Sequence, residues 1–375
     1  MKIAQIAPIW YSIPPKKNIG GAEYIVGELT NELVKNGHDV TLFATGDSLT
    51  SAKLVSFIPK GIGENGLPQG REFFLTPLLH FVKSLDYIKA NNFDIIHCHF
   101  STLADYVLFG LIRDLPNIVI TNHQVFPDKK LEPDRFTLFQ HFSHLNFVDI
   151  SKTQQNPDLP LYPIVPNGIV IPNLPEIKKT EKIVWMSRIA PEKGLLEAIK
   201  ASKKLQKEFD FAGAIKREKD RPYFEECMSQ IEPGISYKGI VRDSDKFNFL
   251  GNAKLFLFPI TWNEPFGLVI VEAMVTGTPI VAFANGAARE IVKDGVTGFL
   301  VNESKEKIHG DYAIKKVGLE GLEEAIQRIY DMSPDEYEEM RENSNKHVLE
   351  NYTMEKMTNG YEAIYQRVQR NFDKI

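Results

Sequence analysis

Cysteine is scarce in this chain, and long apolar runs are missing. Only two of the 375 residues are cysteine, Cys98 and Cys227, and both stand in apolar surroundings far apart in the sequence. Two isolated thiols give neither a disulfide framework nor the spacing of a zinc site, which favours a reducing, cytoplasmic location. No stretch approaches the roughly 20 apolar residues that a membrane helix requires. We therefore expect a soluble protein. Peripheral contact with a membrane is compatible with this composition.

The chain also lacks an excess of positive charge. Its formal net charge is -5 at pH 7, so it has no broad basic surface of the kind that binds nucleic acid, and we expect no such partner. An anionic ligand must then be held by a local site. The content of 43% hydrophobic and 25% charged residues is that of a folded globular protein.

Short apolar runs alternate with longer helical patterns, which is typical of βαβ units and parallel sheets. The predicted strands cover residues 3–9, 40–44, 95–98, 118–121, 147–150, 183–186, 209–212, 255–258 and 279–282. A helix is expected over residues 22–36, because its apolar residues share one face and Gly37 follows as a stop. The pattern predicts an α/β protein.

A proline-rich stretch separates two such α/β halves. Six prolines in 19 residues exclude a helix interior or a central strand and indicate a linker. They are Pro157, Pro160, Pro163, Pro166, Pro172 and Pro175. We therefore predict one Rossmann-like domain over residues 1–170 and a second over residues 171–352, followed by a helical segment over residues 353–375.

The most informative segment runs from Trp262 to Ala273 and follows a very apolar predicted strand. Pro265 suits the first position of a helix, which would place Glu264 at the cap and Glu272 about two turns inside. Eight residues of continuous helix would separate the two carboxylates by about 12 Å along the axis, more than the roughly 5–9.5 Å of a glycoside hydrolase pair. The pair therefore resembles two clamps on an extended ligand.

The backbone amides between these glutamates are available for anionic oxygens. They belong to Phe266, Gly267 and Leu268. The alternative is that Glu264 only caps the helix and that Glu272 lies on a solvated face. Glu272 stands among apolar neighbours, however, and a carboxylate in such a place normally has a partner.

Two cations flank a turn after the predicted strand at residues 183–186. The guanidinium of Arg188 and the ammonium of Lys193 suit a diphosphate and its departing charge. The alternative is that both are solvated loop residues.

These motifs together resemble those of the family-4 glycosyltransferases. Glu264-Pro265-Phe266-Gly267-Leu268, followed after three residues by Glu272-Ala273, is similar to the family's E-x7-E element. Other matching motifs follow in the family's order, and the resemblance covers essentially the whole chain. They are Gly20-Gly21-Ala22-Glu23, His97-Cys98-His99, Thr121-Asn122-His123, Val165-Pro166-Asn167-Gly168-Ile169 and Ser187-Arg188-Ile189-Ala190-Pro191-Glu192-Lys193-Gly194.

The resemblance implies the GT-B fold, with two Rossmann-like domains facing each other across a cleft, and a retaining, metal-independent hexosyltransferase without a cofactor. The N-terminal domain would bind a small-molecule, glycan or lipid-linked acceptor, and the C-terminal domain a nucleotide-diphosphate sugar. The final helix would cross back to the N-terminal domain.

Carried over to this sequence, the family's site residues take distinct roles. Glu264 would contact the donor sugar's hydroxyls and Glu272 the ribose, while Arg188 and Lys193 bind the diphosphate. His123 would lie near the anomeric carbon.

Several other features have two interpretations. Gly20-Gly21 lacks the dinucleotide fingerprint and is expected to allow close approach to the donor's phosphates or sugar, unless it is only a flexible turn. His97 and His99 share a strand face, but no third metal ligand is near them. Asp243-Ser244-Asp245 is expected at a helix start rather than at a metal, and the charged segment 303–311 is expected to be a solvated excursion.

Two rival functions stay open. One is a disaccharide phosphorylase or disaccharide synthase of the same fold, and the other is a non-catalytic nucleotide-sugar binding protein.

Overall fold

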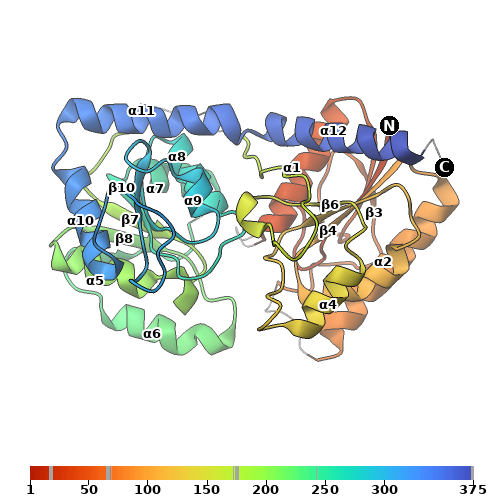
Figure 1. Cartoon of the computed structure of the whole chain (residues 1–375), viewed down its shortest axis with the longest axis horizontal. Helices are drawn as coiled ribbons and strands as arrows, with labels where there is room; N and C mark the ends of the chain where they lie inside the picture. The colour runs from red at the N-terminus through yellow and green to blue at the C-terminus, as the bar shows by residue number, and fades with distance from the viewer. Residues whose placement is uncertain are drawn as a thin grey trace. The chain divides into compact units, whose positions relative to one another are not determined.

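The chain forms two compact units in a computed structural model, which describes residues 1–16, 20–64, 68, 70–171, 173, 177–241 and 243–372 (Figure 1). One unit comprises Met1–Gly168 and Met354–Ile375, and the other comprises Ile169–Thr353. Pro172 and Pro175 of the predicted linker lie outside the described residues. Within the described ranges, no helix is long and apolar enough to cross a membrane.

The N-terminal unit is built on a parallel sheet with the strand order β3-β2-β1-β4-β5-β6. The strands are β1 (Lys2–Ile6), β2 (Asp39–Phe43), β3 (Lys53–Val55), β4 (Ile95–Phe100), β5 (Ile118–Asn122) and β6 (Phe147–Val148). The helices are α1 (Gly21–Lys35), α2 (Glu72–Asn91), α3 (Phe109–Ile112), α4 (Pro133–His141) and α12 (Met354–Phe372). Helix α12 packs against α1, β4 and β5, so the last helix of the chain belongs to the first unit.

The two faces of this sheet differ in chemistry, because successive side chains of a strand point to opposite faces. On β4, Ile96, Cys98 and Phe100 join a core rich in phenylalanine from α2, α3 and α4. His97 and His99 alternate with them and are also buried, on the face that α12 covers. A fully buried strand thus carries an apolar face and a polar face.

The C-terminal unit repeats the architecture with the strand order β12-β11-β10-β7-β8-β9. The strands are β7 (Ile183–Met186), β8 (Phe209–Ala212), β9 (Ile235–Tyr237), β10 (Leu255–Phe258), β11 (Ile280–Phe283) and β12 (Gly298–Val301). The helices are α5 (Leu195–Lys204), α6 (Arg221–Ser229), α7 (Asp243–Gly251), α8 (Leu268–Val275), α9 (Ala288–Ile291), α10 (Gly318–Tyr330) and α11 (Pro334–Asn351).

The predicted α/β class is confirmed, and each predicted strand is present. Strand β1 ends at Ile6 instead of residue 9, because Pro8 has no amide hydrogen to donate to the sheet. The short strands β3, β9 and β12 were not predicted. The start of a helix at Asp243 is confirmed, and most of segment 303–311 is exposed, as expected.

In each unit the first strand lies beside the fourth strand of the same unit, which creates a point where the direction of winding reverses. In the N-terminal sheet this point lies between β1 and β4, and in the C-terminal sheet between β7 and β10. Open α/β sheets bind ligands outside the carboxyl ends of the strands at such a point. We therefore expect ligands to bind at the loops that follow these four strands.

Acid should destabilise the folded protein, because burial lowers the pKa of several histidines. The pKa of His80 and of His123 falls to about 4, and those of His97 and His99 fall well below the usual value. Between pH 6.5 and about 4 the unfolded chain binds protons that the native protein excludes. Each such proton lowers the unfolding free energy by roughly 1.4 kcal/mol per pH unit of acidification.

Two buried aspartates act in the opposite direction. Burial raises the pKa of Asp105 to about 6 and of Asp149 to about 7, so the native protein holds protons that the unfolded carboxylates release. Four histidines against two aspartates predict a net loss of stability from pH 7 to pH 5, measured by urea denaturation. The control Asp149→Asn removes one opposing group and should steepen the loss. An equal or higher midpoint at pH 5 would contradict this account.

Candidate functional site

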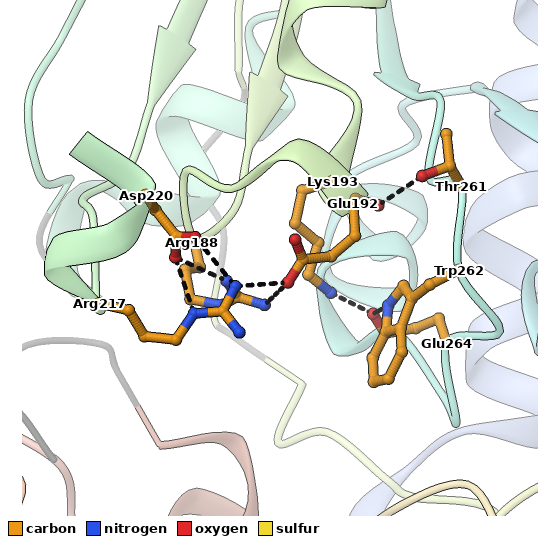
Figure 2. A network of polar contacts seen from close by, with 8 residues as sticks. All are labelled: Arg188, Glu192, Lys193, Arg217, Asp220, Thr261, Trp262 and Glu264. Carbon is orange, nitrogen blue, oxygen red and sulfur yellow. Dashed lines mark hydrogen bonds and ion pairs between the residues drawn. The ribbon is translucent and has the colours of Figure 1, made fainter. Parts of the chain in front are cut away.

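The charged loops of the C-terminal unit meet where β7 and β10 end. These strands are paired neighbours, with Leu255 opposite Ile183, so their carboxyl ends lie at the same sheet edge. Arg188 and Lys193 follow β7, whereas Trp262 and Glu264 follow β10 (Figure 2). The sequence motifs on either side of residue 200 thus form one cluster.

Gly194 allows these two loops to approach each other. It follows a 3-10 turn over Pro191–Lys193 and has a φ of 72°, in the left-handed region that glycine adopts without strain. A Cβ atom at this position would stand 1.9 Å from the carbonyl oxygen of Pro259. The amide of Thr261 also donates to the carbonyl of Glu192 over 3.1 Å. The backbone therefore fixes the relative position of the two loops.

Lys193 and Glu264 form an ion pair across the two loops. The Lys193 ammonium and the indole N–H of Trp262, the latter at 3.0 Å, both donate to Oε2 of Glu264. Only 11% of the Lys193 side chain and 16% of the Glu264 side chain are exposed. These donors hold the Glu264 carboxylate in one orientation, with little water to screen the pair.

Two arginines and two acids form a second cluster beside this pair (Figure 2). Glu192 accepts from Arg188 at 2.6 Å and from Arg217 at 2.9 Å. Asp220 lies 2.8 Å from Nε of Arg217 and 3.5 Å from Nη1 of Arg188. Burial would raise the pKa of Glu192, but hydrogen bonds and charge from Arg188 and Arg217 outweigh it and hold this pKa at about 2. The four formal charges cancel.

The helix that carries Glu272 begins later than predicted. Helix α8 starts at Leu268, after Gly267 in a left-handed conformation with a φ of 88°. The prediction that Pro265 opens the helix and Glu264 caps it is wrong, because the left-handed residue interrupts the helical path. The separation of about 12 Å, which assumed continuous helix, loses its basis.

Glu264 is held instead by the loop after β11. Its carbonyl accepts from the amide of Ala287 at 2.9 Å, and a Cβ atom on Gly286 would stand 2.3 Å from its backbone nitrogen. Among the described residues, nothing accepts a hydrogen bond from the amides that follow it, at Phe266, Gly267 and Leu268. These donors remain available to an anion.

Glu272 is buried, with 7% of its surface exposed, and it has a partner, as expected for a carboxylate among apolar neighbours. Its Oε1 accepts from the ammonium of Lys246 on α7 at 2.7 Å. A second ion pair of low exposure thus lies on the helix that begins at the carboxyl end of β10.

In the N-terminal unit, Gly20 and Gly21 open helix α1, as the predicted turn requires. Gly20 has a φ of 127°, and a Cβ atom on it would lie 2.9 Å from Oε2 of Glu23. Glu23 is buried in the first turn, so the positive end of the α1 dipole already has a carboxylate beside it.

His123 directly follows β5, where the sequence placed it. Its Nε2 lies 3.1 Å from Nδ1 of His99, and the two rings are stacked with centroids 5.4 Å apart. His97 and His99 share a strand face as predicted, with ring centroids 4.0 Å apart. No group of three side chains suited to hold a metal ion occurs in the part of the chain that the structure describes.

A cavity lies at the carboxyl ends of β1 and β4, where the N-terminal sheet reverses its winding. Its lining is mostly apolar and includes Ile9, Trp10, Phe81 and Phe100. His80 and Asp105 add polar groups. This is the position at which the topology predicts a ligand.

Sequence reasoning missed the partners of the predicted residues. Arg217 and Asp220 follow β8, and Lys246 lies on α7. Gln5 lies on β1 beside His97 in the sheet register. The position of Arg217 after a predicted strand was an available signal, whereas nothing in the sequence indicated Lys246 or Gln5.

The chain resembles known glycosyltransferases in sequence. Residues 170–347 match the family described as "Glycosyl transferases group 1", and residues 19–150 match "Glycosyltransferase Family 4". The phosphatidyl-myo-inositol mannosyltransferase of Mycolicibacterium smegmatis is 25% identical over 80% of this chain and 81% of its own length.

Solved structures resemble the whole chain at low identity. The sucrose-phosphate synthase of Thermosynechococcus elongatus has a TM-score of 0.77 at 17% identity, with 98% of this chain and 99% of that chain covered. The Anabaena protein HepE, solved in complex with UDP-glucose, has a TM-score of 0.67 at 18% identity, with full coverage of both chains.

We predict that Gly194→Ala destabilises the protein more than Gly234→Ala. Both positions have a positive φ, but a Cβ atom on Gly234 would meet nothing within 4 Å. The control should cost about 1 kcal/mol from backbone strain. Gly194→Ala should cost a further ~1–3 kcal/mol, because the Pro259 carbonyl must move. Chemical denaturation measures both variants, and equal losses would show that this close approach is unimportant.

Proposed function

Because the chain belongs to glycosyltransferase family 4 and has the GT-B fold, we propose that it transfers a hexose from a nucleotide-diphosphate sugar to an acceptor hydroxyl with retention of configuration. The observation that carries the proposal is the pairing of Lys193 with Glu264 beside Arg188, at the carboxyl ends of β7 and β10. A sugar diphosphate needs a carboxylate for its hydroxyls and cations for its phosphates next to each other.

The C-terminal unit would bind the donor. Glu264 would accept hydrogen bonds from the sugar's hydroxyls, and Glu272, oriented by Lys246, those from the ribose. Arg188 and Lys193 would bind the diphosphate. The amides at Phe266, Gly267 and Leu268, which have no acceptor among the described residues, would supply further donors to its oxygens.

The positions of two cations support a metal-independent reaction. Lys193 and Arg188 already lie in place, held by Glu264, Glu192 and Asp220. A diphosphate that binds beside them meets cations already in position, without reorganisation of the loops, which favours the departing charge in the transition state. We therefore expect turnover without added divalent metal.

The N-terminal unit would bind the acceptor. Its cavity at β1 and β4 is mostly apolar, and helix α2, which lines it, also exposes a row of apolar side chains. These are Phe74, Leu75, Leu79 and Val82. The combination supports a lipid-linked acceptor among the possible small-molecule, glycan and lipid-linked classes, together with peripheral membrane contact.

We assign proposed roles to Gly20, Gly21 and His123 of the N-terminal unit as well. The two glycines would allow the backbone to approach the donor's phosphates or sugar, and His123 would lie beside the anomeric carbon. In the transfer itself, the acceptor oxygen bonds to the anomeric carbon on the face from which the diphosphate departs. The leaving phosphate takes the proton of the acceptor hydroxyl.

A disaccharide synthase is the second candidate, favoured by the structural likeness to sucrose-phosphate synthase. It differs only in its acceptor, which would be a free or phosphorylated sugar. Release of a disaccharide from a nucleotide sugar and such an acceptor would identify it.

The proposed function predicts a product with the donor's anomeric configuration, formed at the same rate in EDTA. The test begins with calorimetric titration of UDP-, GDP- and ADP-sugars to find the donor that binds. Transfer is then followed by proton NMR of the first-formed product. An inverted anomer, or activity that EDTA abolishes and Mg²⁺ restores, would refute the proposal.

Replacement of each glutamate by glutamine should separate their roles. Glu264→Gln should chiefly lower kcat, because its contacts tighten as charge develops on the sugar. Glu272→Gln should weaken donor binding about tenfold, because the ribose does not change during the reaction. Both isosteres keep the side-chain shape beside Lys193 and Lys246. Unchanged affinity of a folded Glu272→Gln for the free nucleotide would exclude the ribose role, and full kcat in Glu264→Gln would exclude the sugar role.

A further inference from the structure

A continuous chain of hydrogen bonds links His123 to the last helix of the protein. His123 contacts His99 at 3.1 Å, and His99 Nε2 contacts Gln5 Oε1 at 2.8 Å. The amide nitrogen of Gln5 lies 3.1 Å from the hydroxyl of Tyr365 on α12. Except for His123, these side chains are at least 97% buried, so water cannot substitute for their partners.

A second branch of hydrogen bonds runs from the Tyr365 hydroxyl to Tyr361. This hydroxyl lies 2.7 Å from Nδ1 of His97, and Nε2 of His97 lies 2.8 Å from the hydroxyl of Thr121. Thr121 in turn contacts the hydroxyl of Tyr361 at 2.8 Å. When Gln5 donates to Tyr365, Tyr365 donates to His97, His97 to Thr121 and Thr121 to Tyr361. Every bond then holds one proton.

The same direction determines the tautomer of His99. With the amide nitrogen of Gln5 on Tyr365, its oxygen faces His99 and can only accept, so Nε2 of His99 carries a proton. Burial, with the neighbouring His97 and His123, holds the pKa of His99 well below its usual value, so its ring is neutral. Nδ1 of His99 therefore carries no proton and can only accept.

His123 must then donate from Nε2 to Nδ1 of His99. Burial lowers the pKa of His123 to about 4, so its ring is also neutral near pH 7 and Nδ1 carries a lone pair. Among the described residues, Nδ1 of His123 has no hydrogen-bond partner, and the residue is partly exposed. An outward acceptor atom is left at the carboxyl end of β5.

We propose that Tyr365, Gln5 and His99 are positioning residues that lock His123 as the Nε2–H tautomer, so that its Nδ1 accepts a hydrogen bond from a ligand hydroxyl. The identification of that hydroxyl with the sugar donor or acceptor rests on the proposed function. The proposed tautomer of His123 is independent of that function. In this state His123 recognises a hydroxyl, and it has no proton on Nδ1 to give to a leaving phosphate.

The tautomer is measured directly, without turnover. In the full-length protein labelled with ¹⁵N-histidine, long-range proton–nitrogen correlation spectra at pH 7 show which ring nitrogen carries the proton. The His123 signals are identified by their loss in His123→Gln. We expect a neutral Nε2–H ring for both His123 and His99. An Nδ1–H or doubly protonated His123 in the wild type would overturn the proposal.

Two matched variants on α12 test the role of the relay. Tyr365→Phe removes the acceptor that orients Gln5, so His123 should populate both tautomers. Tyr361→Phe removes a hydroxyl at the far end of the other branch and should leave His123 unchanged. Identical spectra for His123 in the two variants would refute the role of Tyr365.

The variant Gln5→Glu extends the test to the reaction. Its carboxylate favours a protonated His99, which would donate from Nδ1 and force His123 to carry its proton on Nδ1. We expect this reversed tautomer and a loss of kcat of about tenfold, as for one lost hydrogen bond. A reversed tautomer with full kcat would retain the relay and exclude His123 from the reaction. An unchanged tautomer would refute the relay, and if the variant does not fold, the wild-type spectrum still decides.

Discussion

The N-terminal unit depends on the need to satisfy polar groups buried on one face of its sheet. Gln5, His97 and Thr121 lie on three adjacent strands and are fully buried, and an unpaired polar group in such a place costs roughly 1–3 kcal/mol. The hydroxyls of Tyr361 and Tyr365 supply the missing partners from α12. This explains why a helix at the end of the chain folds onto the first domain, since an apolar helix would leave these groups unpaired.

The C-terminal unit solves a different problem at the equivalent topological position. There the groups are charged, and they are stabilised by pairing and by close backbone approach. Gly194 brings the β7 loop against Pro259, and Gly286 brings the β11 loop against Glu264. Lys193 and Glu264 consequently meet at low exposure. One strand order thus supports a hydrogen-bonded network in one unit and an ionic cluster in the other.

The sequence supported the larger features of the site better than its local geometry. The strand pattern, the positions of Arg188, Lys193 and His123 at strand ends, and the need of Glu272 for a partner were all predictable from local signals. The start of α8 was not, because Pro265 satisfies the usual rule for a first helical residue, while the left-handed turn at Gly267 depends on the loops packed around Glu264. Local helix propensity and tertiary contacts compete at such a position, and here the tertiary contacts determine where the helix begins.

The sequence by itself determined the α/β class, the family resemblance and the identities of the charged residues, because alternating hydrophobicity and motif order are properties of the chain alone. Only the tertiary structure decided which charges neutralise each other and which side chains each buried histidine contacts. Arg188 and Arg217 share two carboxylates, and His123 connects to Tyr365 through residues more than 90 positions apart. Pairing of charges and tautomers depends on distances of about 3 Å between such segments, and sequence spacing contains no information on those distances.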